Sequence, residues 1–174
     1  MGSKKILLLR HAKSSWKHPD LSDHDRPLNK RGRAAAPVIG AWLRQNGHVP
    51  DLILSSTSVR TRQTLELLNL PAEPAIHVEF LPELYHAAPE ALLTALRSAS
   101  DTSNCVMIVG HQPGLSSFAG MFSERAERHC VQAYEHFPTA AVAVFQTVTA
   151  NWSDLGFCSA VFTDFVKPRD LIDG

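Results

Sequence analysis

The stretch "ILLLRHAKSSW", residues 6–16, joins four aliphatic residues directly to an arginine and a histidine. A short, unbroken apolar run is typical of a strand that is covered on both faces of a parallel sheet. A turn signal is expected after such a strand, but charged side chains follow at once. The stretch therefore predicts a buried strand over Ile6–Leu9 whose end presents a guanidinium, Arg10, and an imidazole, His11, side by side.

Beyond this stretch the chain alternates between apolar runs and helical patterns. The further strands predicted from the runs are Asp51–Ser56, Cys105–His111, 140–148 and 157–165, the last two being consistent with a hairpin. The predicted helices cover 30–46, 59–69, Pro89–Ser98 and Gly114–Phe122. Strands that alternate with helices favour an α/β fold, a three-layer α/β/α sandwich with a mainly parallel central sheet. We expect this sandwich to form a single domain over residues 1–174.

Two of the predicted helices have clear boundary signals. Asn29 is a typical N-cap for the first helix, and Gly47 is a typical residue to end it. Thr57 or Ser58 caps the second helix. Pro37 either kinks the first helix or marks its true first turn, because proline cannot continue the helical hydrogen bonds.

The composition is that of an ordinary globular protein. Hydrophobic residues make up 44% of the chain and charged residues 20%, and no apolar run approaches the roughly 18 residues that span a bilayer. Ile6–Leu9 is too short for a signal-peptide core and lacks a cleavage site, so we expect a cytoplasmic protein without a membrane partner. Cys105, Cys130 and Cys158 show no CxxC spacing, which predicts reduced, mostly buried thiols.

The charge is balanced overall but unevenly distributed. Residues 1–62 hold 12 of the 17 lysines and arginines and carry a net charge of +8, which leaves −8 for residues 63–174. A neutral chain is a poor general nucleic-acid binder, because that binding depends on many phosphate contacts. The basic N-terminal third either serves one small anionic site or is mixed by folding into an even surface.

The predicted strand ends carry one recurring kind of side chain. Ligands of open α/β sheets bind beyond the carboxyl ends of the strands. The first strand ends at Arg10 and His11, and a later strand ends at His111. Arg60 lies one turn into the helix that follows the strand at 51–56. We therefore expect two arginines and two histidines to meet around one point.

Such a cluster suits a phosphoryl group. Arginine binds phosphate oxygens through two parallel hydrogen bonds and keeps its charge, and histidine is a competent covalent nucleophile. Phosphoryl transfer needs chiefly positioning and charge stabilisation, so we expect neither a metal nor another cofactor. The other histidines form no HExxH motif, and Glu83-x-x-His86 is one copy of a pattern that di-iron bundles need twice.

Several segments together resemble the histidine phosphatase superfamily, the group typified by phosphoglycerate mutases. The matching segments are "LLLRHAKSSW", "DRPLNKRG", "LILSSTSVRTRQT", "LPEL" and "IVGHQPGL", and they follow the family's order across nearly the whole chain. The short length and the wording of "RHAKSSW" and "DRPL" are most similar to SixA-type phosphohistidine phosphatases, which lack the helical insertion that covers the site in mutases. Only 27 residues lie between Glu83 and His111, which leaves little room for such a lid.

The resemblance implies a role for each matched residue. His11 would be the nucleophile that accepts the phosphoryl group, and Arg10 and Arg60 would hold its oxygens. His111 would stabilise the group during transfer, and Glu83 falls where the family often keeps its proton donor.

Three further residues are implied as substrate contacts. Ser14 matches the serine of the family's RHGxS pattern, and Gln112 follows the second histidine. Arg26 in "DRPL" is either a third phosphate contact or a charge that braces its loop. Ala12 stands where the family has glycine, which the turn tolerates if its φ is negative.

These observations favour a metal-independent phosphatase that works through a phosphohistidine at His11 and acts on phosphohistidine in a protein. One alternative is a phosphatase of the same family that acts on small phosphate esters. A different class, a phosphate-binding module without turnover, would explain the arginines but not a histidine in their midst. The segment "DFVKPRDL", residues 164–171, matches the family's general appearance and has no chemical role that the sequence assigns.

Overall fold

A six-stranded mixed sheet forms the centre of the computed structural model, which describes residues 2–124 and 131–172. The strand order across the sheet is β3-β2-β4-β1-β5-β6. The first four strands in this order pair in parallel, whereas β5 is antiparallel to both β1 and β6. The strands are β1 (Ser3–Arg10), β2 (Leu52–Ser55), β3 (His77–Phe80), β4 (Cys105–Gly110), β5 (Val142–Val148) and β6 (Val161–Val166).

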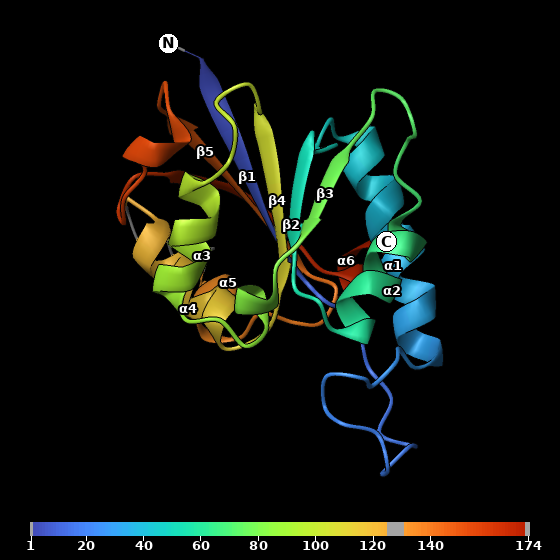
Figure 1. The fold of residues 1–174 in the computed structure, drawn as a ribbon. Coiled ribbons are helices and arrows are strands. Elements are labelled where there is room, and N and C mark those ends of the chain that lie inside the picture. Colours follow the sequence, from blue (N-terminus) through green and yellow to red (C-terminus); the bar gives the residue numbers. More distant parts are fainter. Residues whose placement is uncertain (1, 125–130, 173–174) are drawn as a thin grey trace.

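Helices cover both faces of the sheet, as Figure 1 shows. One layer holds α1 (Lys30–Gln45), α2 (Val59–Leu68) and α6 (Pro168–Ile172). The other holds α3 (Pro89–Arg97), α4 (Gly114–Phe122) and α5 (Val131–Glu135). The short 3-10 helices η1 (Pro82–Leu84) and η3 (Trp152–Asp154) lie in connections. The predicted three-layer α/β/α sandwich is therefore confirmed. No helix in the described parts of the chain is long and apolar enough to cross a membrane.

The core lies on both sides of the two central strands. Residues 6–9 of β1 and 106–109 of β4 are fully buried, and their side chains alternate between the two helical layers. A strand with both faces covered must be apolar at every position, which is why these runs were readable in the sequence. Burial of this kind dominates the stability of the fold, at roughly 25 cal/mol for each Å² of apolar surface removed from water.

The predicted helix boundaries are confirmed at three points. The Asn29 side chain accepts a hydrogen bond from the Gly32 N–H at 2.9 Å, and Ser58 caps α2 by accepting from the Thr61 N–H. Gly47 follows α1 with a φ of 66°, a conformation that glycine adopts without strain. Pro37 lies inside α1, so it does not mark the first turn.

Some elements were not predicted. Strand β3 is exposed at all four positions, and its alternation of polar and apolar residues, "HVEF", extends over these four positions only, the shortest pattern by which a strand is recognised. It lies at an edge of the sheet and pairs only with β2. The late strands do form an antiparallel pair, but β6 begins at Val161 rather than at residue 157.

The prediction for the cysteines is wrong in part. Cys105 is partly buried, and burial raises the pKa of its thiol to about 12. Cys158 is exposed, because it lies in the connection before β6 rather than within the strand. Cys130 lies outside the described residues.

The expected absence of a helical insertion is confirmed. The 3-10 helix η1 is joined to α3 by the four residues 85–88, and α4 begins four residues after β4 ends. The α4 start packs closely here, because a Cβ on Gly114 would lie 2.1 Å from the Ala87 carbonyl oxygen. No helix stands above the carboxyl ends of the parallel strands in this part of the structure (Figure 1).

Candidate active site

The carboxyl ends of the parallel strands bring the four predicted residues together. Strands β1 and β4 are neighbours in parallel register, with Arg10 opposite Gly110, so His11 and His111 follow them side by side. Their ring centroids are 5.2 Å apart. A pocket of about 440 Å³, here called the strand-end pocket, is lined by Arg10, His11, Lys13, Ser14, Trp16, Asp23, Arg26, Arg60, His86, His111, Gln112, His136, Pro138 and Thr139.

His11 is buried and held in one tautomer. Its Nδ1 lies 2.7 Å from the carbonyl oxygen of Ala12, and because a carbonyl can only accept, Nδ1 carries the proton. Nε2 of the neutral ring therefore keeps its lone pair. Burial lowers the pKa of His11 to about 3, the charges of Arg60 and Arg10 act in the same direction, and the Ala12 hydrogen bond opposes them. The ring is neutral at ordinary pH, as a nucleophile must be.

The turn after β1 is fixed by α2 and by the start of α1. The Ala12 N–H donates to Thr64 Oγ1 of α2 at 2.9 Å, and the Lys13 carbonyl accepts from the Asn29 N–H at 2.9 Å. Gly32 allows α1 to approach, because a Cβ there would lie 2.2 Å from the Lys13 carbonyl oxygen. Ala12 is not among the residues with positive φ, so the turn accepts alanine in place of the family's glycine.

The two arginines lie in the pocket wall with hydrogen-bonding capacity unused. Arg10 donates from one terminal nitrogen to the Phe137 carbonyl at 2.8 Å. Arg60, although 1% exposed, donates to the Asp23 carbonyl at 2.5 Å and to the Asp23 carboxylate at 3.0 Å. The Nε atoms of both arginines are buried and have no hydrogen-bond partner in the described parts of the chain. Unpaired buried donors are costly, and they are expected where a protein is built to receive an anion.

His111 is also buried, and both of its ring nitrogens have partners. Nδ1 accepts from Arg60 at 3.3 Å, so the proton lies on Nε2, which donates to Ser56 Oγ at 2.8 Å. Burial lowers the pKa of His111 to about 2, helped by the neighbouring His11 and Arg60. The strand-end pocket is therefore lined by a second neutral imidazole next to that of His11.

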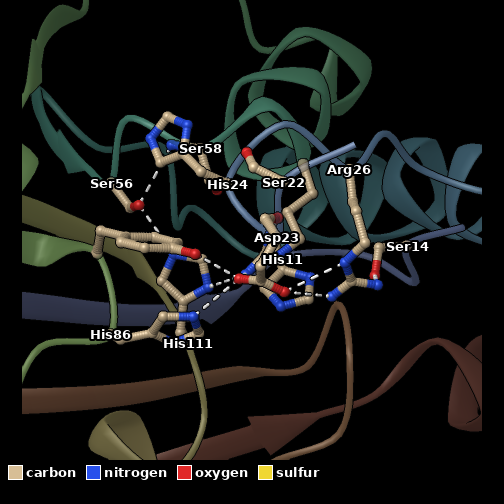
Figure 2. Close-up of polar contacts among 12 residues, drawn as sticks. His11, Ser14, Ser22, Asp23, His24, Arg26, Ser56, Ser58, His86 and His111 are labelled. Atoms are coloured by element: carbon tan, nitrogen blue, oxygen red, sulfur yellow. Dashed lines mark hydrogen bonds and ion pairs between the residues drawn. The ribbon is translucent and has the colours of Figure 1, made fainter. Parts of the chain in front are cut away.

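The Asp23 carboxylate joins two sides of the strand-end pocket (Figure 2). It accepts from Arg26 at 2.9 Å, from Arg60 at 3.0 Å, from His86 at 3.0 Å and from the Tyr85 hydroxyl. Burial alone would raise the pKa of Asp23, but the hydrogen bonds from Tyr85, His86 and Arg26 and the charge of Arg60 outweigh it and hold the pKa well below its ordinary value. Asp23 is therefore a permanent anion that orients two arginines and a histidine.

Arg26 acts as a brace in this structure. Its guanidinium donates to Ser14 Oγ at 3.0 Å and to Asp23, and it stacks on the Trp16 ring with 3.6 Å between the guanidinium carbon and the ring centroid. Ser14 thereby contacts Arg26 as well as lining the pocket. These contacts favour the prediction that Arg26 stabilises its loop. Because Arg26 also lines the pocket, a contact with a bound phosphate stays possible by position.

Gln112 and Glu83 differ in their placement. Gln112 lines the pocket, and its amide nitrogen donates to Ser116 Oγ at 2.5 Å. Glu83 is exposed on η1 and is not among the residues that line the pocket. Its assignment as proton donor stays a prediction that this placement does not support.

Sequence reasoning missed the cluster that Asp23 forms with Tyr85 and His86 at the pocket. A signal existed for Asp23, because it lies three residues before Arg26 and two residues before the matching segment "DRPLNKRG" begins. Tyr85 and His86 adjoin "LPEL", but only the fold shows that they turn toward Asp23. Among the described residues, no group of three or more His, Cys, Asp and Glu side chains is placed to hold a metal ion.

Comparisons with known proteins show the family to which the chain belongs. Residues 6–88 match the family model of the histidine phosphatase superfamily, branch 1. An uncharacterized protein of Mycobacterium tuberculosis is 37% identical over 169 residues, which cover 92% of this chain and all of that protein. The chain belongs to the histidine phosphatase superfamily, and it is SixA-like in structure.

Two solved structures carry the SixA likeness. One, from Nakamurella multipartitia and named "putative phosphohistidine phosphatase SixA", has a TM-score of 0.82 and 29% identity, covering 97% of this chain and 98% of that one. Another with the same name, from Agrobacterium tumefaciens, has a TM-score of 0.77 and 31% identity, covering 95% and 98%. Family and neighbours together support phosphatase activity.

Proposed function

We propose that this protein removes the phosphoryl group from phosphohistidine in a protein, through a phosphohistidine intermediate at His11. The lone pair of His11 Nε2 attacks phosphorus, and the bond from phosphorus to the substrate nitrogen breaks with its electron pair going to the departing imidazole. Water then attacks the phosphoryl group on His11, the bond from phosphorus to Nε2 breaks, and phosphate leaves. No metal enters either step, because arginine side chains offset the charge of the phosphoryl oxygens.

The roles of the pocket residues follow from their contacts. Arg10 and Arg60 hold the phosphoryl oxygens next to His11. His111, whose ring centroid lies 5.2 Å from that of His11, stabilises the phosphoryl group during transfer. Asp23 is a positioning residue, because its carboxylate orients Arg60 and Arg26 rather than the substrate. Ser14 and Gln112, which line the pocket, are substrate contacts.

One observation carries the choice of substrate: the single carboxyl group among the lining residues, Asp23, is held ionised. An alkyl phosphate expels a strongly basic alkoxide, which needs a positioned acid worth about 10²–10⁴-fold in rate. Imidazole leaves phosphohistidine as a neutral amine and can take its proton from solvent. The open strand ends also let a macromolecule approach, since η1 and α3 are joined by only four residues.

A substrate panel tests the proposal. The purified chain, treated with a chelator, is given a phosphohistidine protein, an aryl phosphate and a sugar phosphate, and kcat/KM is measured for each. We expect turnover of phosphohistidine and of the aryl phosphate to exceed that of the sugar phosphate by at least about 10²-fold. A preference for the sugar phosphate would instead identify a phosphatase of small metabolites. Binding without turnover of any of the three would identify a phosphate-binding module.

A further inference from the structure

The segment at residues 164–171, to which the sequence assigned no role, lies next to the strand-end pocket. Helix α6 packs beside α1 (Figure 1), and the two helices border a second cavity of about 780 Å³. This cavity, here called the cationic groove, is lined by Lys13, Arg31, Ala34, Ala35, His136, Pro138, Thr139, Lys167, Pro168, Arg169 and Ile172. Lys13, His136, Pro138 and Thr139 line both cavities, so the two spaces adjoin.

The groove is basic along its length. Lys13, Arg31, Lys167 and Arg169 contribute four positive charges, and none of its lining residues is acidic. Lys167 is half-buried and lies 3.7 Å from the Asp170 carboxylate, whereas Lys13 and Arg31 are exposed. Side chains of one sign gathered in a cleft raise the local concentration of ligands of the opposite sign. The groove therefore suits an anionic ligand.

The apolar part of the lining narrows the class of ligand. It consists of short or aliphatic side chains: Ala34, Ala35, Pro138, Pro168 and Ile172. The lining contains no aromatic ring other than that of His136, so it offers no stacking platform of the kind that nucleobases use. Carboxylates on a flexible polypeptide would reach the lysines and arginines of the groove while its backbone lies along the apolar residues of the lining.

We propose that the cationic groove binds an acidic segment of the phosphorylated protein, a run of Asp or Glu residues close in sequence to the phosphohistidine. This inference rests on the proposed function for its first half, the delivery of phosphohistidine to His11. The groove adds what the strand-end pocket lacks, recognition of the protein beyond the phosphoryl group. Exposed pairs are weak one by one, so the selectivity comes from several charges acting together.

Matched peptides test the groove. Two phosphohistidine peptides each carry four Glu residues, one peptide on the N-terminal side of the phosphohistidine and the other on the C-terminal side. Each is compared with a peptide that carries four Ser residues at the same positions. For the Glu peptide that is turned over faster, the wild-type protein should show a kcat/KM about tenfold higher than for the matching Ser peptide, chiefly through a lower KM. This preference should decrease as the salt concentration rises. Arg31→Glu combined with Arg169→Glu should abolish it. Arg33→Glu, an exposed residue of α1 outside the groove, should retain it.

Two further measurements separate the possible failures. Turnover of an aryl phosphate, which is too small to reach the groove, should stay within twofold in all variants and so reports that they are folded. Binding of the unphosphorylated Glu peptide, measured by fluorescence anisotropy, needs no phosphatase chemistry and should also be lost in the double variant. Equal binding of Glu and Ser peptides would overturn the groove proposal, whereas no hydrolysis of any phosphohistidine peptide would overturn only the proposed function. A preference for a short alkyl bisphosphate over the Glu peptide would assign the groove to small molecules and overturn the proposal.

Discussion

The strand-end pocket and the cationic groove are neighbours, and both are basic, but they hold their charges in opposite ways. In the pocket, Arg60 is 1% exposed and is fixed by two hydrogen bonds to Asp23. In the groove, Arg31 extends from the surface of α1 and is exposed. A buried, oriented charge acts at one position with a large effect, whereas an exposed charge acts weakly and is screened by salt. Under the two proposals, the same residue type serves chemistry in one cavity and recognition in the other.

The strongest test of this contrast is the removal of His11. His11→Ala should lower turnover of every substrate by on the order of 10⁴-fold or more, as the loss of a covalent nucleophile does. It should also abolish an acid-labile phosphoenzyme that can be trapped during turnover. His18→Ala, which changes an exposed histidine outside both cavities, is the control and should have full activity. Normal turnover in His11→Ala would remove the covalent mechanism.

The next effect concerns the shape of a buried charge. Arg60→Lys keeps the charge but loses the planar fork, and one lost contact in a preorganised site costs about 10²–10³-fold in kcat. Arg62→Lys provides a matched control, because Arg62 is an exposed residue of the same helix. Wild-type kinetics in Arg60→Lys would place the Arg60 side chain outside the phosphate site and would break the contrast with the groove.

A smaller effect is expected for the residue that positions the arginines. Asp23→Asn weakens the charge-assisted hydrogen bonds to Arg60 and Arg26, which should lower kcat/KM about tenfold. Because Asp23 acts through the arginines, Arg60→Lys should lose much less when it is made in the Asp23→Asn background. Asp25→Asn, which changes an exposed acid of the same loop, serves as the control. Independent, additive losses would show that Asp23 does not act through Arg60.

Buried histidines should also make stability depend on pH. The pKa is about 3 for His11 and about 2 for His111, both lowered chiefly by burial, whereas a histidine in an unfolded chain titrates near 6.5. Below about pH 6.5 the unfolded chain binds more protons than the folded one, so this contribution to stability is fully present above that pH and is lost as the pH falls. Each histidine should cost up to about 1.4 kcal/mol per pH unit between pH 6 and 4.

Urea unfolding of the wild type and of His111→Gln at these two pH values measures the effect. The variant should lose less stability on acidification than the wild type, because one buried histidine is missing. Identical pH dependence in the wild type and His111→Gln would show that the His111 ring is protonated as readily in the folded chain as in the unfolded one.

The smallest effect is expected at Glu83. Because its side chain is exposed and does not line the pocket, Glu83→Gln should change kcat for both an alkyl phosphate and phosphohistidine by less than about twofold. Steady-state kinetics on the two substrates measure this directly. A selective loss on the alkyl phosphate would show that Glu83 reaches the leaving group after all and would restore it as the proton donor.

The sequence was most informative where burial is complete. Residues 6–9 and 106–109 are covered on both faces, so their apolar runs predicted the central strands and, with them, the neighbouring positions of His11 and His111. Strand β3 escaped notice because its alternating pattern, "HVEF", is only four residues long. The Asp23 contacts depend on how the loop before α1 closes over the pocket, and no periodicity in the sequence encodes that closure. Side-chain chemistry and the family resemblance thus predicted a nucleophile and its arginines, but not Asp23, which contacts Arg60 and Arg26.

The central place of β1 has a consequence for the order of events during synthesis. This strand is made first, yet its two neighbours in the sheet, β4 and β5, begin only at Cys105 and Val142. Contacts between residues so distant in sequence form slowly, since a long loop must close before they are gained. A nascent chain that ends before residue 105 contains His11 but lacks both β4 and His111, which follows β4. Folding of the core and assembly of the phosphatase site are therefore one late event, and partly made chains should be inactive as well as unfolded.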